Sequence, residues 1–167
     1  MHTSGGTLIQ NEEDIIKWHE HIQYAKDERI QYKSDILIVK QSIQALGSLN
    51  NIAPNTTANT TNLILHFSFD YAQYVQIPHL VQQEVNIYFK TPIKVQVFGV
   101  CNDAIPQQVI FLNEEKYFVG KGSDAVISQI HFYLANYGYG AQEIILHTDN
   151  CSGQNKNNAL IKYLVGE

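Results

Sequence analysis

Cysteine is scarce in this chain of 167 residues, which contains only Cys101 and Cys151. No two cysteines are separated by two residues, and this argues against a structural zinc site. A single cysteine pair is also too little for the disulfide framework of a small secreted domain. Residues 1–6 lack the apolar run of a signal peptide. The sequence therefore predicts an intracellular protein.

Long apolar runs and an excess of positive charge are lacking as well. No stretch approaches the roughly 18 apolar residues that a membrane-spanning helix needs, so we expect no membrane partner. The chain has 11 basic and 16 acidic residues, which give a net charge of −5. This balance argues against binding of nucleic acid through bulk charge, although it is compatible with a local basic groove.

Tryptophan and methionine occur once each, whereas the chain contains ten tyrosines and seven phenylalanines. Residues of the latter kind are enriched in β-strands, so we expect a core rich in strand aromatics. The length of the chain and its hydrophobic content of 44% are sufficient for one domain with a substantial core.

Residues 1–47 are predicted to form an N-terminal helical segment, with the helical pattern over 11–46. Large side chains recur there at spacings of three and four, at Trp18, Ile22, Ala25, Arg29 and Tyr32. The pattern leaves open whether residues 36–39 continue the helix or form a strand. Residues 48–62 are rich in Asn and Thr and are predicted to be a linker at a domain boundary.

Residues 63–167 show an alternating pattern of strands and helices. Strands are predicted over 63–71, 93–101, 107–114 and 143–148, and helices over 124–137 and from about Gly153 onward. Three antiparallel strands, a crossover helix and a parallel fourth strand are the first two thirds of a ribonuclease-H-like fold. We therefore predict an α/β domain with a mixed sheet of this type, truncated at its C-terminus.

Two aspartates, Asp70 and Asp149, each follow a short apolar run, and open α/β sheets place their chemistry at such strand ends. Side chains alternate along a strand, so Asp70 shares a face with Ser68 and His66, and Asp149 with His147. If the two strands are neighbours, the carboxylates lie a few ångströms apart and repel each other, which a cation would resolve. Oxygen ligands of this kind favour Mg²⁺ or Mn²⁺, and a pair of such ions supports phosphodiester chemistry.

Each of these residues also has a purely structural interpretation. An aspartate at a strand end often caps a turn. His66 and His147 are candidates for additional metal ligands or for positioning a water molecule, but a histidine near the rim of a sheet is also a common hydrogen-bonded packing residue. The sequence alone does not decide between these readings.

The turn over residues 150–158 opens the last predicted helix and is crowded with hydrogen-bond donors. Free N–H groups and the helix dipole favour an anion at such a place, and further donors come from Gln154, Asn155, Lys156 and Asn157. These four residues are candidates for contacting the phosphate backbone of a nucleic acid. The alternative is a polar helix cap that faces solvent.

The motif over residues 147–158, His-x-Asp-Asn-Cys-x-Gly-Gln-Asn-Lys-Asn-Asn, resembles the signature of a family of uncharacterised transposase-like domains from mobile elements. The segment Phe69–Gln73 is similar to an earlier motif of that family. The resemblance implies the ribonuclease-H-like DDE class, which cuts and joins DNA with two metal ions. It also implies a nuclear location, DNA as partner, and Asp70 and Asp149 as the first two acids of the triad.

Two features that the resemblance would imply are not found in this chain: a third acid well beyond the last helix, and a cysteine-rich segment upstream. Glu167 is the only late acid and is expected to be a weak ligand, because chain ends are poorly ordered. Two hypotheses therefore stay open. The chain is either a transposase or nuclease domain that is incomplete and expected to be inactive by itself, or a non-catalytic remnant that serves as a binding module. The sequence indicates no oligomeric state.

Overall fold

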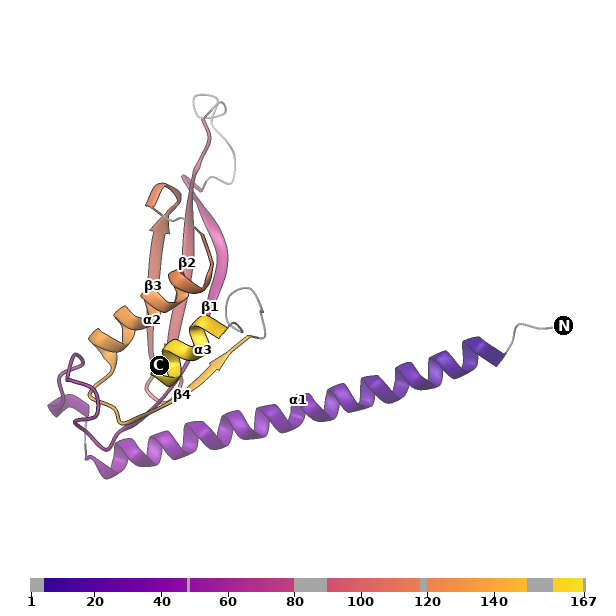
Figure 1. The fold of residues 1–167 in the computed structure, drawn as a ribbon, viewed down its shortest axis with the longest axis horizontal. Helices are drawn as coiled ribbons and strands as arrows, with labels where there is room; N and C mark the ends of the chain where they lie inside the picture. The colour runs from indigo at the N-terminus through magenta and orange to yellow at the C-terminus, as the bar shows by residue number, and fades with distance from the viewer. Residues whose placement is uncertain (1–4, 48, 80–89, 118–119, 150–157, 167) are drawn as a thin grey trace.

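The computed structural model describes residues 5–47, 49–79, 90–117, 120–149 and 158–166. Three α-helices and four strands make up most of this part of the chain (Figure 1). The elements are, in chain order, α1 (Gly5–Ala45), the 3₁₀ turn η1 (Leu49–Asn51), β1 (Ile64–Ile77), β2 (Ile93–Asn102), β3 (Gln107–Glu114), η2 (Glu115–Tyr117), α2 (Ser123–Tyr137), β4 (Glu143–Thr148) and α3 (Asn158–Val165).

The four strands form one mixed sheet in the order β3-β2-β1-β4. β1 pairs antiparallel with β2, and β2 pairs antiparallel with β3. β4 follows helix α2 and lies parallel to β1, with Ile64 opposite Glu143 and Phe69 opposite Thr148. The predicted class and the predicted strand arrangement, three antiparallel strands and a parallel fourth, are therefore confirmed.

The main core lies between the sheet and helices α2 and α3. Phe67 and Phe69 of β1 point to this face, as their alternation with Ser68 and Asp70 predicts. They pack with apolar residues of the neighbouring strand and of both helices: Phe98, Val100, Val126, Ile130, Tyr133 and Leu160. Because α2 and α3 cover this face, α1 packs on the other face of β1 and β4.

Helix α1 is continuous to Ala45, so residues 36–39 belong to a helix and not to a strand. Its second half turns a stripe of side chains toward the sheet, at spacings of three and four: Tyr32, Asp35, Ile36, Val39, Ser42 and Ile43. The first half extends away from the sheet (Figure 1), and Trp18 there is 58% exposed. Only the second half of the helix therefore contributes to the fold.

The Asn- and Thr-rich segment between α1 and β1 is tied to the turn between α2 and β4. The amides of Thr60 and Thr61 donate to the carbonyl of Gly140, and the amide of Tyr139 donates to Pro54. Gly140 has a φ of +71°, and a Cβ there would collide with the hydroxyl of Thr60. Glycine is required at this point because the backbone is left-handed and closely covered.

Candidate functional site

One face of the sheet, on the side of helix α1, collects most of the polar residues that the sequence singles out. His66, Ser68 and Asp70 alternate with the core phenylalanines along β1. The parallel register places His147 of β4 directly opposite Ser68. The prediction that the strands bearing Asp70 and Asp149 are parallel neighbours is confirmed.

Asp70 lies on β1, and Asp149 directly follows the end of β4 at Thr148. The last parallel pair is Phe69 and Thr148, so each aspartate is the next residue along its own strand direction. Both side chains are exposed. One oxygen of Asp70 accepts a hydrogen bond of 2.7 Å from the amide of Tyr71.

The expected end of the first strand is wrong. β1 continues to Ile77 and pairs with β2 along that length, because the partner strand β2 is long enough to satisfy its backbone groups. Asp70 therefore lies at the end of the contact between β1 and β4 and not at the end of β1 itself. This position still leaves its carboxylate beside the end of β4.

An open groove of about 290 Å³ runs along the sheet beside Asp70. Its walls include Ser68, Gly99, Cys101 and Gln108, on three neighbouring strands. Burial, together with the nearby Asp103 carboxylate, raises the pKa of the Cys101 thiol. Cys101 is therefore kept in the protonated form, which is a poor nucleophile.

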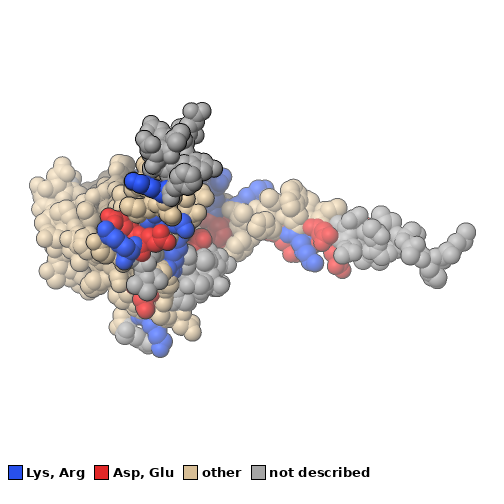
Figure 2. Space-filling model, turned by 90° about the horizontal axis from the view of Figure 1, so that it is seen from above, with Lys and Arg blue, Asp and Glu red and all other residues tan. Residues whose placement is uncertain are grey.

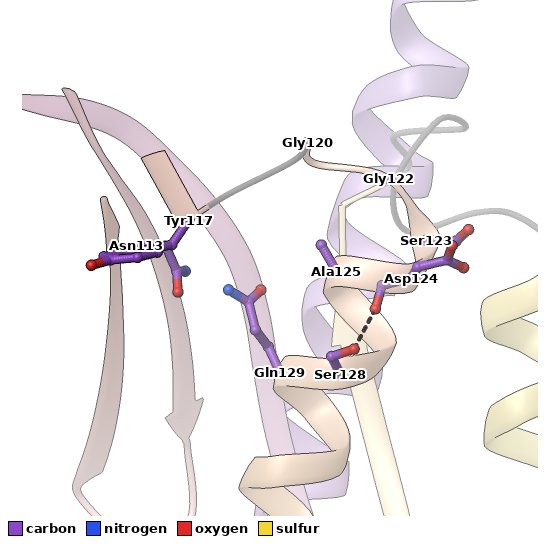
Figure 3. A pocket seen from close by; sticks show the side chains of 9 residues that line it. All are labelled: Asn113, Tyr117, Gly120, Gly122, Ser123, Asp124, Ala125, Ser128 and Gln129. Atoms are coloured by element: carbon purple, nitrogen blue, oxygen red, sulfur yellow. Dashed lines mark hydrogen bonds between the residues drawn. The ribbon is translucent and has the colours of Figure 1, made fainter. Parts of the chain in front are cut away.

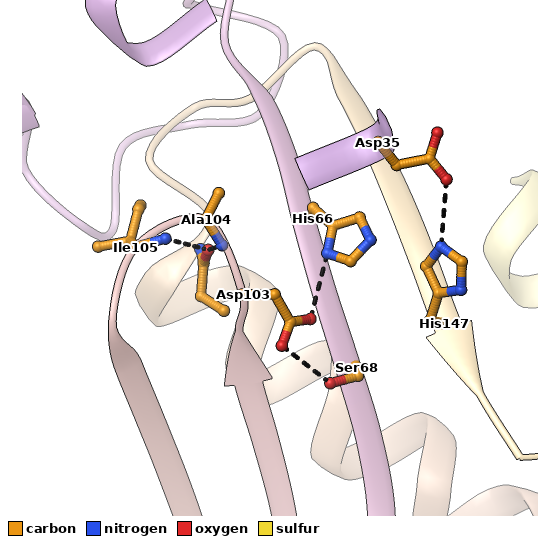
Figure 4. Close-up of polar contacts among 8 residues, drawn as sticks. Asp35, His66, Ser68, Asp103, Ala104, Ile105 and His147 are labelled. Atoms are coloured by element: carbon orange, nitrogen blue, oxygen red, sulfur yellow. Dashed lines mark hydrogen bonds and ion pairs between the residues drawn. The ribbon is translucent and has the colours of Figure 1, made fainter. Parts of the chain in front are cut away.

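Farther along the same face, Asp35 of α1 meets His66 of β1 and His147 of β4 (Figure 4). One ligand atom from each residue lies within 4.8 Å of the other two. Nε2 of His147 is 3.3 Å from Oδ2 of Asp35. His66 is completely buried, and its Nε2 has no hydrogen-bond partner among the described residues. The three residues form a compact set of nitrogen and oxygen donors.

A second layer of polar groups surrounds these three residues. Nδ1 of His66 lies 3.1 Å from a carboxylate oxygen of Asp103, and the other oxygen of Asp103 accepts from the Ser68 hydroxyl at 3.5 Å. Gln31 donates to Oδ1 of Asp35 at 2.7 Å. The outer groups thus fix the orientation of both a histidine ring and a carboxylate.

Tyr32 closes the cluster from the side of α1. Its ring makes edge contacts with both imidazoles, with centroid distances of 5.2 Å to His66 and 5.1 Å to His147. Burial and a hydrogen bond to Asp103 raise the pKa of the Tyr32 hydroxyl to about 12. Burial lowers the pKa of His66 despite the opposing effect of Asp103. Its neutral form, which can ligate a metal through nitrogen, is therefore favoured.

Sequence reasoning missed Asp35, Asp103 and Tyr32 as members of a site. A signal for Asp35 existed, because it is an acid on the otherwise apolar stripe of Tyr32, Ile36 and Val39. Asp103 lies in the turn between two strands, where an aspartate is ordinary. Neither residue could be connected to the histidines without knowing where α1 packs.

The predicted phosphate-contacting residues, Gln154, Asn155, Lys156 and Asn157, lie outside the described residues, as does Glu167. Among the described residues visible in Figure 2, basic and acidic side chains are mixed and form no broad surface of one sign. The described residues of this face therefore form no electrostatic track for a phosphate backbone of the kind that non-specific binding uses.

A larger pocket of about 520 Å³ lies between the end of β3 and the start of α2 (Figure 3). It is lined by Asn113, Tyr117, Asp124 and Gln129, among others. The Ser128 hydroxyl at its edge is already engaged, because it donates to the carbonyl of Asp124 at 2.8 Å. The described residues that line the pocket include a single carboxylate and no histidine or cysteine, so among them the paired groups of a catalytic site are lacking.

No family model, curated protein or solved structure matches this chain. Within the part of the chain that the structure describes, no helix combines the length and apolar character needed to cross a membrane. The site must therefore be interpreted from its own chemistry. It contains two exposed carboxylates where the parallel contact of β1 and β4 ends. Deeper on the same face it contains a largely buried cluster of two histidines and an aspartate.

Proposed function

We propose that the chain is a ribonuclease-H-like domain of the DDE transposase or nuclease class, in which Asp70 and Asp149 hold Mg²⁺ or Mn²⁺ against the phosphates of DNA. The observation that carries this proposal is the parallel register of β1 and β4, which gives the two aspartates equivalent positions. Strand order β3-β2-β1-β4 with a helical crossover and the family-like motifs around both acids support it.

The residues present fit a hard divalent cation. Both carboxylates are exposed, so water can complete the coordination shell, as Mg²⁺ prefers. A bound ion would act there as a Lewis acid on a phosphate oxygen. The side chains of Asp70 and Asp149 would position it, and the amide of Tyr71 would orient the Asp70 carboxylate through its hydrogen bond.

A second candidate is a non-catalytic binding module that retains the sheet. The mixed charges on the described surface (Figure 2) favour this alternative, because strand cleavage requires a firmly held phosphate backbone. The two candidates differ in whether the handling of DNA depends on a metal ion and on both aspartates.

The test is an assay of the purified chain with Mn²⁺ and end-labelled DNA, with retention and cleavage both measured. We expect Mn²⁺-dependent retention or cleavage, and Asp70→Asn and Asp149→Asn should each reduce it at least about 100-fold. Replacing an outer partner of a metal ligand already costs roughly 10–100-fold, and these residues would be the ligands themselves. The matched control is Asp124→Asn, an exposed aspartate in the first turn of α2.

The control variant should behave like the parent chain. If the parent neither retains nor cleaves DNA with Mn²⁺, or if both aspartate variants match Asp124→Asn, the proposed function is wrong. DNA retention that needs no metal and survives both substitutions would instead favour the binding module.

A further inference from the structure

The cluster of Asp35, His66 and His147, in which Asp35 and His66 are buried and His147 is partly buried, is distinct from the exposed acids Asp70 and Asp149. We propose that these three residues form a binding site for Zn²⁺, which joins helix α1 to strands β1 and β4. The site does not depend on the proposed function, because its donor atoms come from different side chains and suit a different class of metal ion.

The distances carry the first part of the argument. Zn²⁺ bonds to imidazole nitrogen and carboxylate oxygen at about 2.0–2.2 Å in a tetrahedral site, so two ligand atoms are separated by about 3.3 Å. Nε2 of His147 and Oδ2 of Asp35 are 3.3 Å apart, the separation expected of two ligands. The third donor lies within 4.8 Å of both, so a small side-chain movement would complete the set.

The second part is a buried nitrogen that nothing described satisfies. Nε2 of His66 is fully buried and has no hydrogen-bond partner among the described residues. A buried polar atom without a partner is costly, and a metal ion would remove that cost. In Figure 4 the ring of His66 lies between Asp103 on one side and His147 on the other. Its Nδ1 is turned to Asp103, which leaves Nε2 for the cluster.

The third part is the outer layer, which has the form found around metal ligands. A ligating histidine commonly has a carboxylate on its other ring nitrogen, and Asp103 stands in this position to His66 at 3.1 Å. Gln31 holds the other oxygen of Asp35 at 2.7 Å. Two carboxylates beside two imidazoles also leave negative charge in a poorly solvated place, which a divalent cation would neutralise.

The donor set favours Zn²⁺ over Mg²⁺. Imidazole suits Zn²⁺, whereas Mg²⁺ prefers an all-oxygen shell with several waters. Two histidines and one carboxylate leave a fourth tetrahedral position for water. Sequence reasoning named His66 and His147 as candidate ligands but not Asp35, because the three residues are 31 and 81 positions apart along the chain. The usual sequence signal for structural zinc is paired cysteines, which this site lacks.

The consequence of binding is a cross-link between α1 and the sheet. Within the described stripe of α1, Asp35 and Val39 are the two buried side chains, so few apolar contacts hold the helix in place. A metal ion bonded to one residue of each element would restrain the helix strongly, because binding to the native state alone adds to its stability. The expected result is a helix whose docking depends on Zn²⁺.

The test is calorimetric titration of the metal-depleted full chain with Zn²⁺, paired with the visible absorption spectrum of bound Co²⁺. We expect one Zn²⁺ per chain and a Co²⁺ spectrum of a four-coordinate nitrogen and oxygen site. Asp35→Asn, which changes a ligand itself, should weaken Zn²⁺ binding at least about 100-fold. Asp103→Asn, which removes an outer partner, should weaken it roughly 10–100-fold.

The matched control is Asp27→Asn on the same helix. Asp27 is exposed and accepts a hydrogen bond from Gln23 at 2.9 Å, as Asp35 does from Gln31. The Asp27→Asn variant should leave Zn²⁺ affinity unchanged. Asp70→Asn should also leave it unchanged, which tests whether Zn²⁺ binding is independent of the Asp70 and Asp149 pair. Absence of Zn²⁺ binding, equal loss in the control, or a Co²⁺–thiolate absorption band would overturn the proposal.

Hydrogen exchange on the parent chain keeps the proposal testable if the variants fail to fold. Addition of Zn²⁺ should slow exchange of the amides in residues 32–39 of α1 and around His66, and leave residues 12–25 of the same helix unchanged. Slowing spread evenly over α1, or none at all, would contradict a site at Asp35.

Discussion

Replacing Phe67 with alanine is expected to lower the free energy of unfolding by about 3–5 kcal/mol, the usual cost of removing a buried aromatic ring. Phe67 is completely buried at the centre of the sheet. Its ring packs against Tyr133 of α2 at a centroid distance of 5.0 Å. The cavity left by the substitution is bordered by Val126, Ile130 and Tyr133 of α2, which belong to the same buried cluster, and a packed core of this kind relaxes only partially. Denaturation by urea, followed by circular dichroism, measures the effect.

Phe132→Ala is the matched control for this substitution. Phe132 is on helix α2, next to the Tyr133 that contacts Phe67, but it is 54% exposed. Its described ring contact is an edge contact with Phe111 at a centroid distance of 5.8 Å. The loss should be about 1 kcal/mol or less. Similar losses for both variants would show that the core is not located between α2 and the face of β1 that carries Phe67.

The second large effect is the loss of the stabilisation of the folded chain by Mn²⁺ when Asp70 or Asp149 is changed. At a concentration 100 times its dissociation constant, a bound ion raises the free energy of unfolding by about 2.7 kcal/mol. Asp70→Asn and Asp149→Asn should each remove this gain. Without metal, each variant should be at least as stable as the parent, because repulsion between neighbouring carboxylates is relieved. Thermal unfolding with and without Mn²⁺ measures both effects.

The control for the metal effect is again Asp124→Asn, which should retain the full response to Mn²⁺. An identical response in all three variants would place the stabilising ion elsewhere. Zn²⁺ is excluded from these experiments by chelation before Mn²⁺ is added, since the histidine cluster is expected to respond to it.

Much of the sheet could be predicted because its signals are local. Alternation placed His66, Ser68 and Asp70 on the face opposite Phe67 and Phe69, and the structure confirms this. The break between the second and third strands was also predicted. In the structure the side-chain oxygen of Asn102 stabilises the turn there, because it accepts hydrogen bonds from the amides of Ala104 and Ile105. The end of β1 could not be predicted, because the length of this strand is set by its pairing with β2, whose residues are distant in sequence.

The histidine cluster could not be predicted because it depends on how α1 docks. The regular spacing from Trp18 to Tyr32 predicted a helix, which the structure confirms, but Trp18 is exposed. The buried stripe begins at Tyr32 and includes a charged residue, Asp35. Hydrophobic periodicity identifies a helix, but it does not identify which turns of that helix meet a sheet, nor that an acid there faces two histidines.

The most direct test of the paired-carboxylate site is an anomalous difference map from crystals of the chain grown with Mn²⁺. Asp70 and Asp149 are each the residue after the last parallel pair of β1 and β4, Phe69 and Thr148. These positions predict a peak between the two side chains, bonded to at least one oxygen of each. A peak that contacts only one of these aspartates, or Mn²⁺ bound solely at other residues, would contradict the account.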